Sequence, residues 1–212
     1  MRDYEEWHEA YDDPNSSLSW RLRVVSELVA AAIDRHSEHS RQMRVLSACS
    51  GDGRDLLDVL ARRSDTDRVS ATLVELHPAI AERARRRAVT IGANIEVRTA
   101  DAGLTDSYIG AVPADLVLMV GIFGNVDAAD LARTIAALPQ FCSPGATVIW
   151  SRGIAAGGNN DGIRAQFAEE GFVESDYRVF DVDQGGPAVG MATYTGPPVS
   201  LVPGTTLFRF YR

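Results

Sequence analysis

The stretch from Val45 to Asp55, VLSACSGDGRD, constrains the fold of this chain more than any other. A short apolar run leads into two closely spaced glycines, Gly51 and Gly53, and a helical pattern begins at Arg54. Apolar runs of this length are typical of buried strands, and glycine lets a backbone turn tightly and approach a ligand. The free N–H groups of the next helix would face the same crevice. The stretch predicts a strand–turn–helix unit that holds a nucleotide-like ligand, with a plain tight turn as the alternative.

Strand-like and helix-like segments alternate beyond this unit. Strands are predicted at residues 44–49, 69–76, 95–100, 114–123, 146–151, 173–182 and 205–212. Helices are predicted at residues 54–63, 78–91, 127–141 and 161–172. The alternation is typical of an α/β fold with a doubly wound, mostly parallel seven-stranded sheet. No helix separates the last two strands, which predicts an antiparallel last strand. The glycine- and proline-rich stretch 183–204 between them is interpreted as a surface loop.

The length of the chain and its N-terminal pattern bound the domain organisation. A chain of 212 residues suits one domain with a single core, so we expect residues 1–212 to form one unit. Residues 1–40 form its N-terminal helical segment, and residues 43–212 form its core. Apolar residues recur at helical spacing in the first segment and predict a buried stripe: Leu18, Leu22, Val25, Val29 and Ile33. We expect this segment to close over the ligand as a helical lid.

Composition narrows the class of partner. The net charge of -8 argues against a general polyanion-binding surface. The two cysteines, Cys49 and Cys142, lie far apart, without the spacing of a metal site or a disulfide framework. The acidic, polar first residues do not resemble a secretory signal, and prolines and glycines interrupt the longest uncharged runs. We therefore expect a cytoplasmic protein with a small-molecule substrate, no metal, and neither a nucleic acid nor a membrane as partner.

Three chemical features occur in order at the ends of the first three strands, where ligands bind in an open α/β sheet. The glycine turn is the first. Glu75 ends the second strand, and a carboxylate about twenty residues beyond such a turn suits a ribose diol. Asp101 and Ala102 follow the third strand, where a carboxylate and a backbone N–H suit an exocyclic amine and a ring nitrogen. Leu56 stands where a dinucleotide fingerprint has its third glycine, so a nicotinamide-dependent oxidoreductase stays the less favoured alternative.

These residues resemble the class I S-adenosylmethionine-dependent methyltransferases. The resemblance is carried by VLSACSGDGRD, by VELHPAIAERARRRA around Glu75, by RTADAGL around Asp101 and by LVLMVGIFGNV along the fourth strand. It covers about residues 43–153. It implies a Rossmann-like core, S-adenosyl-L-methionine as cofactor, and methyl transfer to an oxygen or nitrogen of a small molecule. Such transfer depends mainly on positioning and on exclusion of water.

The resemblance also implies a set of cofactor-binding residues. They are Ser47, Cys49, Gly51, Asp52, Gly53, Asp55, Glu75, Leu76, Asp101, Ala102, Gly121 and Ile122. Two positions depart from the family, which usually has an acid where Ser47 stands and a glycine where Cys49 stands. That acid often helps to place the methionine moiety, and three replacements stay open: Asp52, Asp55 or a polar residue of the N-terminal segment. The departures also motivate a third hypothesis, a non-catalytic or non-methylating S-adenosylmethionine-binding protein.

Catalytic residues are not assigned by the sequence, because a positioned sulfonium needs a general base only when the nucleophile arrives protonated. The candidates are His8 and Tyr11 in the N-terminal segment, Asn125 after the fourth strand and Arg152 at the end of the fifth. For Trp150, near the same strand end, core packing is an equal alternative. The N-terminal aromatic residues and the segment GGPAVGMATYTGPP, residues 185–198, are predicted either to wall the substrate pocket or to form a homodimer contact.

Overall fold

The computed structural model describes residues 13, 16–37, 42–153, 160–180 and 187–210. Its strands are β1 (Met43–Ala48), β2 (Val69–Glu75), β3 (Asn94–Thr99), β4 (Ala114–Met119), β5 (Cys142–Arg152), β6 (Phe172–Val179) and β7 (Ala188–Tyr194). Its α-helices are α2 (Ser17–Ser37), α3 (Arg54–Leu60), α4 (Pro78–Ala88), α5 (Ala128–Ala137) and α6 (Asn160–Glu169). Three short 3-10 helices are η1 (Thr66–Arg68), η2 (Thr105–Tyr108) and η3 (Leu138–Phe141).

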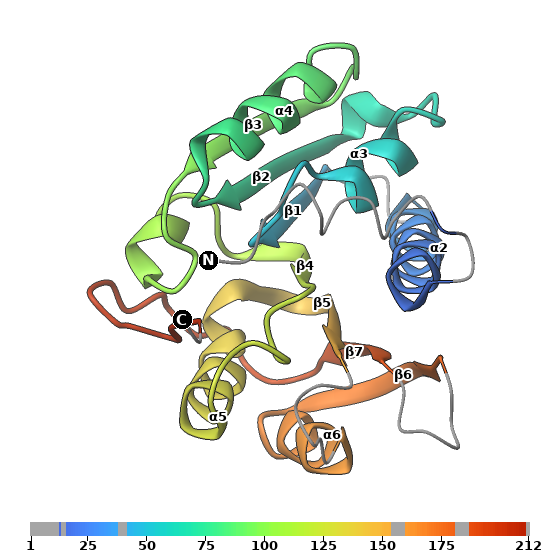
Figure 1. Ribbon diagram of the computed structural model, residues 1–212. Helices are drawn as coiled ribbons and strands as arrows, with labels where there is room; N and C mark the ends of the chain where they lie inside the picture. Colours follow the sequence, from blue (N-terminus) through green and yellow to red (C-terminus); the bar gives the residue numbers. More distant parts are fainter. Residues whose placement is uncertain (1–12, 14–15, 38–41, 154–159, 181–186, 211–212) are drawn as a thin grey trace.

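The strands form one seven-stranded sheet in the order β3-β2-β1-β4-β5-β7-β6 (Figure 1). The pairs among β1 to β5 are parallel, and β7 is antiparallel to both of its neighbours. The strand order reverses beside β1, so the loops that follow β1 and β4 lie at a switch point. Open α/β sheets bind ligands at such a point. The predicted doubly wound, mostly parallel seven-stranded sheet with an antiparallel last strand is confirmed.

Helices cover both faces of the sheet because successive side chains of a strand point to opposite faces. On β1, Val45 packs in the cluster that includes the buried residues of α2 and α3. Leu46 and Ala48 pack in the opposite cluster, with residues of α5 and α6. Of the stripe predicted on α2, Val25, Val29 and Ile33 are buried in the core, and Leu18 and Leu22 are half-buried.

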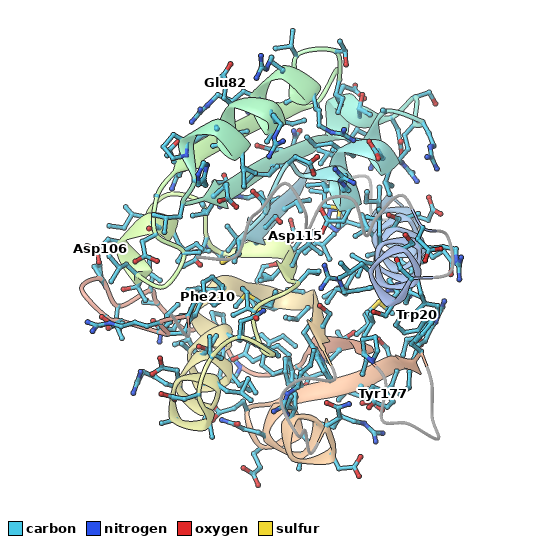
Figure 2. The ribbon with its side chains drawn as sticks, in the orientation of Figure 1. Trp20, Glu82, Asp106, Asp115, Tyr177 and Phe210 are labelled. Carbon is cyan, nitrogen blue, oxygen red and sulfur yellow. The ribbon has the colours of Figure 1, made fainter. Side chains whose placement is uncertain are left out.

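Helix α2 is tied to the far half of the sheet as well as to α3. Trp20 packs edge-on against Phe180, with ring centroids 5.6 Å apart (Figure 2). Glu27 pairs with Arg178 of β6 at 2.8 Å. The rest of the predicted N-terminal segment, residues 1–12, 14–15 and 38–41, lies outside the described residues. Within the described ranges, none of the helices has both the length and the apolar character that a membrane crossing requires.

The position of the last strand corrects the sequence analysis. The antiparallel strand is β7, which lies inside the stretch interpreted as a loop, whereas residues 205–210 contribute only an isolated bridge from Thr206 to Leu104. Gly190 explains the error, because a Cβ there would lie 2.4 Å from the indole of Trp150. Glycine inside a strand allows such a close approach, and the surrounding prolines and glycines flank the strand without entering it.

One predicted helix and one predicted strand also end earlier than expected. Pro139 ends the helix predicted at 127–141, which gives α5 followed by η3. The apolar run 114–123 leaves the sheet after Met119, and its remaining residues turn through Gly121, whose φ is 77°. That early exit places the residues after β4 at the edge of the sheet, where the turn after β1 also lies.

Candidate functional site

The turn after β1 combines three left-handed residues: Cys49, Gly51 and Gly53 have φ values of 51°, 57° and 73°. A Cβ on Gly51 would meet nothing within 4 Å, so the backbone here borders open space. A Cβ on Gly53 would lie 2.7 Å from Leu73 Cδ2. Gly53 therefore provides the close packing of helix on strand that the dinucleotide fingerprint assigns to its third glycine, and the turn remains accessible at Gly51.

Glu75, at the end of β2, holds this turn in place. Its Oε2 accepts a hydrogen bond from the Gly51 N–H at 3.0 Å, and its Oε1 accepts one from the His77 N–H at 2.8 Å. A carboxylate offers about four acceptor positions, so these two bonds leave capacity for the hydroxyls of a ribose. Glu75 was predicted to bind a ligand, whereas its role as a brace has no local sequence signal because it depends on the register of β1 and β2.

The loop after β3 is joined to the same edge. The Ala100 N–H donates to the Glu75 carbonyl at 3.1 Å. The exposed Asp101 accepts from the Gly103 N–H at 2.8 Å, and the carbonyl of buried Ala102 accepts from the Tyr108 hydroxyl at 2.5 Å. The structure therefore brings Glu75 and the predicted adenine-reading loop together.

Cys49 lies among these acids and stays a thiol. Burial raises its pKa well above the ordinary range, and the negative charges of Glu75 and Asp101 raise it further. Only a thiolate is a nucleophile or a good metal ligand. The half-buried Cys49 is therefore a left-handed turn residue that contacts the core, and its raised pKa disfavours the nucleophilic thiolate.

The loop after β4 is fixed by two side chains. The Gly121 N–H donates to Ser151 Oγ at 2.9 Å, and the Gly121 carbonyl accepts from Asn125 Nδ2 at 2.8 Å. Ser151 is fully buried on β5. The side chain of Ile122 is buried in the core. Next to Gly121, this loop therefore offers backbone atoms to a ligand. The sequence analysis did not anticipate the role of Ser151.

The catalytic candidates fall in three places. Asn125 is exposed and holds Gly121. Arg152 ends β5 and is half-buried. His8 and Tyr11 lie outside the described residues. Trp150 belongs to the core, because it is 2% exposed and stacks on Phe167 with ring centroids 5.8 Å apart.

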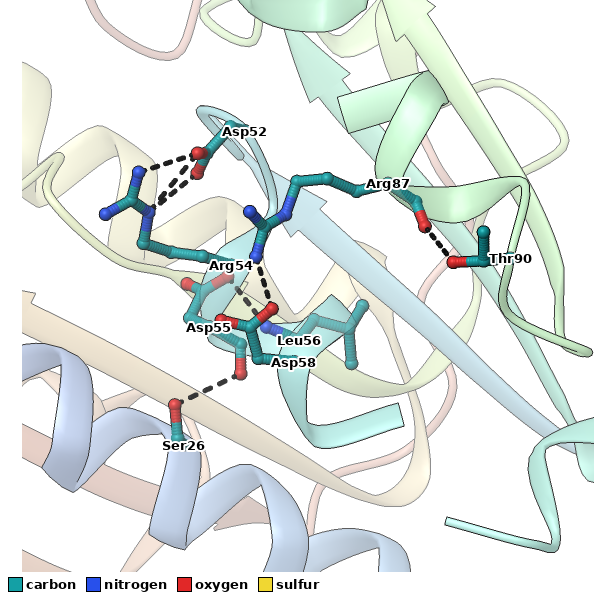
Figure 3. A network of polar contacts seen from close by, with 8 residues as sticks. All are labelled: Ser26, Asp52, Arg54, Asp55, Leu56, Asp58, Arg87 and Thr90. Atoms are coloured by element: carbon teal, nitrogen blue, oxygen red, sulfur yellow. Dashed lines mark hydrogen bonds and ion pairs between the residues drawn. The ribbon is translucent and has the colours of Figure 1, made fainter. Parts of the chain in front are cut away.

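Charged groups surround the start of α3 (Figure 3). Asp52, which is buried, forms an ion pair with Arg54 at 2.7 Å, and a second bond joins Arg54 Nε to Asp52 Oδ1 at 3.0 Å. Asp55 Oδ1 accepts from the Leu56 N–H at 2.9 Å. Burial raises the pKa of Asp55 to about 6, while the positive charge of Arg21 acts in the opposite direction. Asp52 is thus paired with a cation of the same turn, whereas the cation that acts on Asp55, among the residues the structure describes, comes from another helix.

Arg21 reaches this edge from α2. Its Nη1 lies 3.9 Å from the position that a Cβ on Gly121 would take, and its charge acts on Asp55. Ser47 is buried on β1, in register with Leu73 of β2 and Leu118 of β4. The guanidinium of Arg21 therefore lies beside the loop after β4, and its charge acts on the first turn of α3, which follows β1.

Comparison with known proteins identifies the fold. No family model matches the chain, and no curated protein matches it by sequence. The structure is similar to magnesium protoporphyrin IX methyltransferase from Synechocystis, solved with bound S-adenosylmethionine, at a TM-score of 0.63 and 13% identity over 82% of this chain and 79% of that one. It is also similar to a TehB-like S-adenosylmethionine-dependent methyltransferase from Corynebacterium glutamicum, at a TM-score of 0.59 and 16% identity over 79% and 87% of the chains.

A third similar structure has a different activity in its name. It is the [4+2]-cyclase SpnF, at a TM-score of 0.54 and 12% identity over 73% of this chain and 76% of that one. At these identities the likeness concerns the fold. The chain has the class I S-adenosylmethionine-dependent methyltransferase fold, with the strand order and antiparallel β7 described above.

Proposed function

We propose that this protein binds S-adenosylmethionine at the edge of the sheet where β1, β2, β3 and β4 end, and transfers its methyl group to an oxygen or nitrogen of a small molecule. One observation carries the proposal: the loops after β1 and β3 are both hydrogen-bonded to Glu75, beside open space at Gly51. The presence of S-adenosylmethionine in a structure of the same fold supports it.

The residues present fit the adenosine part of the cofactor. Glu75 would accept the ribose hydroxyls, and Asp101 with the Ala102 N–H would read the adenine edge. Leu76 is 62% exposed, although it is a large apolar side chain at this edge. An adenine ring packed against Leu76 would remove that apolar surface from water, which is favourable by about 25 cal/mol per Å². The open backbone at Gly51 would border the amino-acid part.

The chain would contribute chiefly position. S-adenosylmethionine, when bound, supplies a methyl group made electrophilic by a sulfonium. Holding a nucleophile in the correct geometry accounts for about 7–11 kcal/mol of a barrier in well-oriented systems. The Gly121 loop, held by Ser151 and Asn125, suits that purpose because it is fixed from both sides. Asn125 and Arg152 remain the described candidates for contact with the substrate, and we retain His8 and Tyr11 as candidates from the N-terminal segment.

We extend the proposal to the organisation of the whole protein. Residues 1–212 form one domain, in which residues 1–40 cover the core of residues 43–212. The protein acts in the cytoplasm on a small molecule, without a nucleic acid or membrane partner. The net charge of -8 supports the absence of a nucleic acid partner. Its exposed surfaces also suit a homodimer contact, for which sedimentation velocity is the measurement.

Calorimetric titration tests the binding step. We expect the intact protein to bind S-adenosylmethionine and its demethylated product, S-adenosylhomocysteine, at micromolar concentrations and to show no heat with NADH. Binding of NADH alone would favour the nicotinamide-dependent oxidoreductase instead.

A methyl-transfer assay with a panel of small oxygen and nitrogen nucleophiles tests the chemistry. Tight cofactor binding without transfer to any of them would favour the non-methylating alternative. The serine at position 47 and the structural likeness to a cyclase are the observations that keep this alternative in view.

A further inference from the structure

The amino-acid end of an S-adenosyl ligand has a chemical requirement that the glycine turn alone does not meet. It carries an α-ammonium and an α-carboxylate, so its site needs an anionic and a cationic group close together. Ser47 stands where the resembling family usually has an acid, and a hydroxyl cannot neutralise an ammonium. Other side chains at this edge must therefore supply the charges.

Arg21 and Asp55 come from different elements and lie at the right place. Arg21 approaches Gly121, at the end of β4, with its Nη1 3.9 Å from the position of a Cβ there. Its charge also acts on the carboxyl of Asp55, in the first turn of α3. Helix α2 also contacts Asp55 directly, because Ser26 Oγ donates to the Asp55 carbonyl at 3.5 Å (Figure 3). The turn that starts α3 follows β1, and β1 pairs with β4, so Arg21 and Asp55 lie at the same edge of the sheet.

The other charged pair at the turn is less suitable. Arg54 binds both oxygens of Asp52, and the side chain of Asp52 is only 9% exposed. Asp55, in contrast, accepts the Leu56 N–H, and burial makes its ionised form unfavourable. The groups that act on this carboxyl are Arg21 of α2, which favours ionisation, and Asp52, which opposes it. An incoming ammonium would favour ionisation further, because an opposite charge stabilises a buried carboxylate.

We propose that Arg21 and Asp55 hold the amino-acid end of the S-adenosyl ligand, with the guanidinium on its carboxylate and the Asp55 carboxylate on its ammonium. This inference rests on the proposed function and deepens it. It makes α2 part of the ligand site as well as a cover of the sheet. Arginine suits the role because its planar fork matches a carboxylate with two parallel hydrogen bonds.

Two probes separate this subsite from the adenosine subsite. S-adenosylhomocysteine has the amino-acid end, whereas methylthioadenosine has the same nucleoside and thioether without it. We expect Arg21→Ala to weaken S-adenosylhomocysteine at least about tenfold, which corresponds to about 1.4 kcal/mol, and to leave the affinity for methylthioadenosine within about twofold. Arg23→Ala is the matched control, because Arg23 is an exposed arginine of the same helix, and it should change neither affinity.

Two further variants complete the test. Arg21→Lys keeps the charge and loses the fork, so it should give an intermediate loss and remains informative if Arg21→Ala folds poorly. Asp55→Asn should weaken S-adenosylhomocysteine about fivefold or more, again without effect on methylthioadenosine. Asp58→Asn is its control, because Asp58 lies on the same helix as Asp55 and pairs with Arg87 of α4, outside this subsite (Figure 3).

The outcomes distinguish this inference from the proposed function. Wild-type affinity for S-adenosylhomocysteine in Arg21→Ala, Arg21→Lys and Asp55→Asn would overturn the inference and leave the proposed function standing. Equal losses for both probes would also overturn it, because the residues would then act through the fold. Failure of the wild-type protein to bind either probe would overturn the proposed function itself.

Discussion

Two loops of the proposed site are built in different ways. The turn after β1 is held by Glu75, which lies 24 positions later in the chain and one strand away. The loop after β3 is held by residues near the C-terminus. The Leu207 N–H donates to the Gly103 carbonyl at 2.7 Å, and the Thr205 N–H donates to Thr105 Oγ1 at 2.9 Å across 100 positions. The turn after β1 is therefore held from the neighbouring strand, whereas the adenine loop is held by the C-terminal segment.

The strongest test of the turn after β1 is Gly53→Ala. The left-handed backbone would cost about 1–2 kcal/mol for a residue with a Cβ, and the Cβ would lie 2.7 Å from Leu73 and 2.9 Å from Leu57. Overpacking adds about 1–3 kcal/mol. We expect urea denaturation to show a loss of about 2–5 kcal/mol in the free energy of unfolding. Gly51→Ala is the control, because its Cβ meets only open space, and it should lose only the backbone contribution.

Glu75→Ala tests the link between the two loops. It removes the acceptor of the Gly51 N–H and the proposed ribose contact together. We expect the affinity for methylthioadenosine and for S-adenosylhomocysteine to fall alike, by about 1.5–3 kcal/mol, the range for hydrogen bonds to a charged group. Glu82→Ala, at an exposed position of α4 (Figure 2), should leave both unchanged. Unchanged binding in Glu75→Ala would remove Glu75 from the site.

Gly103→Ala tests the distant brace. Its Cβ would lie 2.4 Å from the Phe208 carbonyl oxygen, so the C-terminal segment must move. We expect a loss of about 1–3 kcal/mol in the free energy of unfolding and weaker binding of methylthioadenosine. Gly153→Ala has open space around its Cβ and is the control. Full retention of methylthioadenosine affinity in a folded Gly103→Ala protein would mean that the C-terminal segment does not position the adenine loop.

The last prediction concerns Asp55, whose ionisation should make the free energy of unfolding depend on pH. Its folded pKa of about 6 lies above the ordinary value for aspartate, chiefly through burial, with Arg21 and Asp52 acting in opposite directions. Ionisation therefore opposes folding: the penalty is fully present above pH 6 and is absent below about pH 4. After allowance for solvent contact, we expect Asp55→Asn to stabilise the protein by about 1 kcal/mol at pH 7.5. Thermal melts at pH 7.5 and pH 4 should show this gain vanish at the lower pH, and an equal gain at both would contradict it.

Elements with local signals could be predicted from the amino-acid sequence. The glycine turn, the apolar run before it and the helix after it lie within eleven consecutive residues, so strand periodicity and turn chemistry identify them directly. Glu75 and Asp101 were predicted for the same reason, because each follows an apolar run. Parallel strands then bring such positions to one edge of the sheet. The order of strands and helices followed from the same alternation of patterns.

Contacts between distant segments could not be predicted in this way, because they form when the whole chain packs. Gly190 fits in a strand because the indole of Trp150 occupies the space that a side chain would need there. No sequence pattern near Gly190 predicts that contact. Likewise, the contact of the C-terminal segment with Gly103 and the approach of Arg21 to Gly121 depend on packing across the sheet. Local sequence fixes backbone preference and hydrophobic period. Contacts between segments depend on the register and packing of the whole chain.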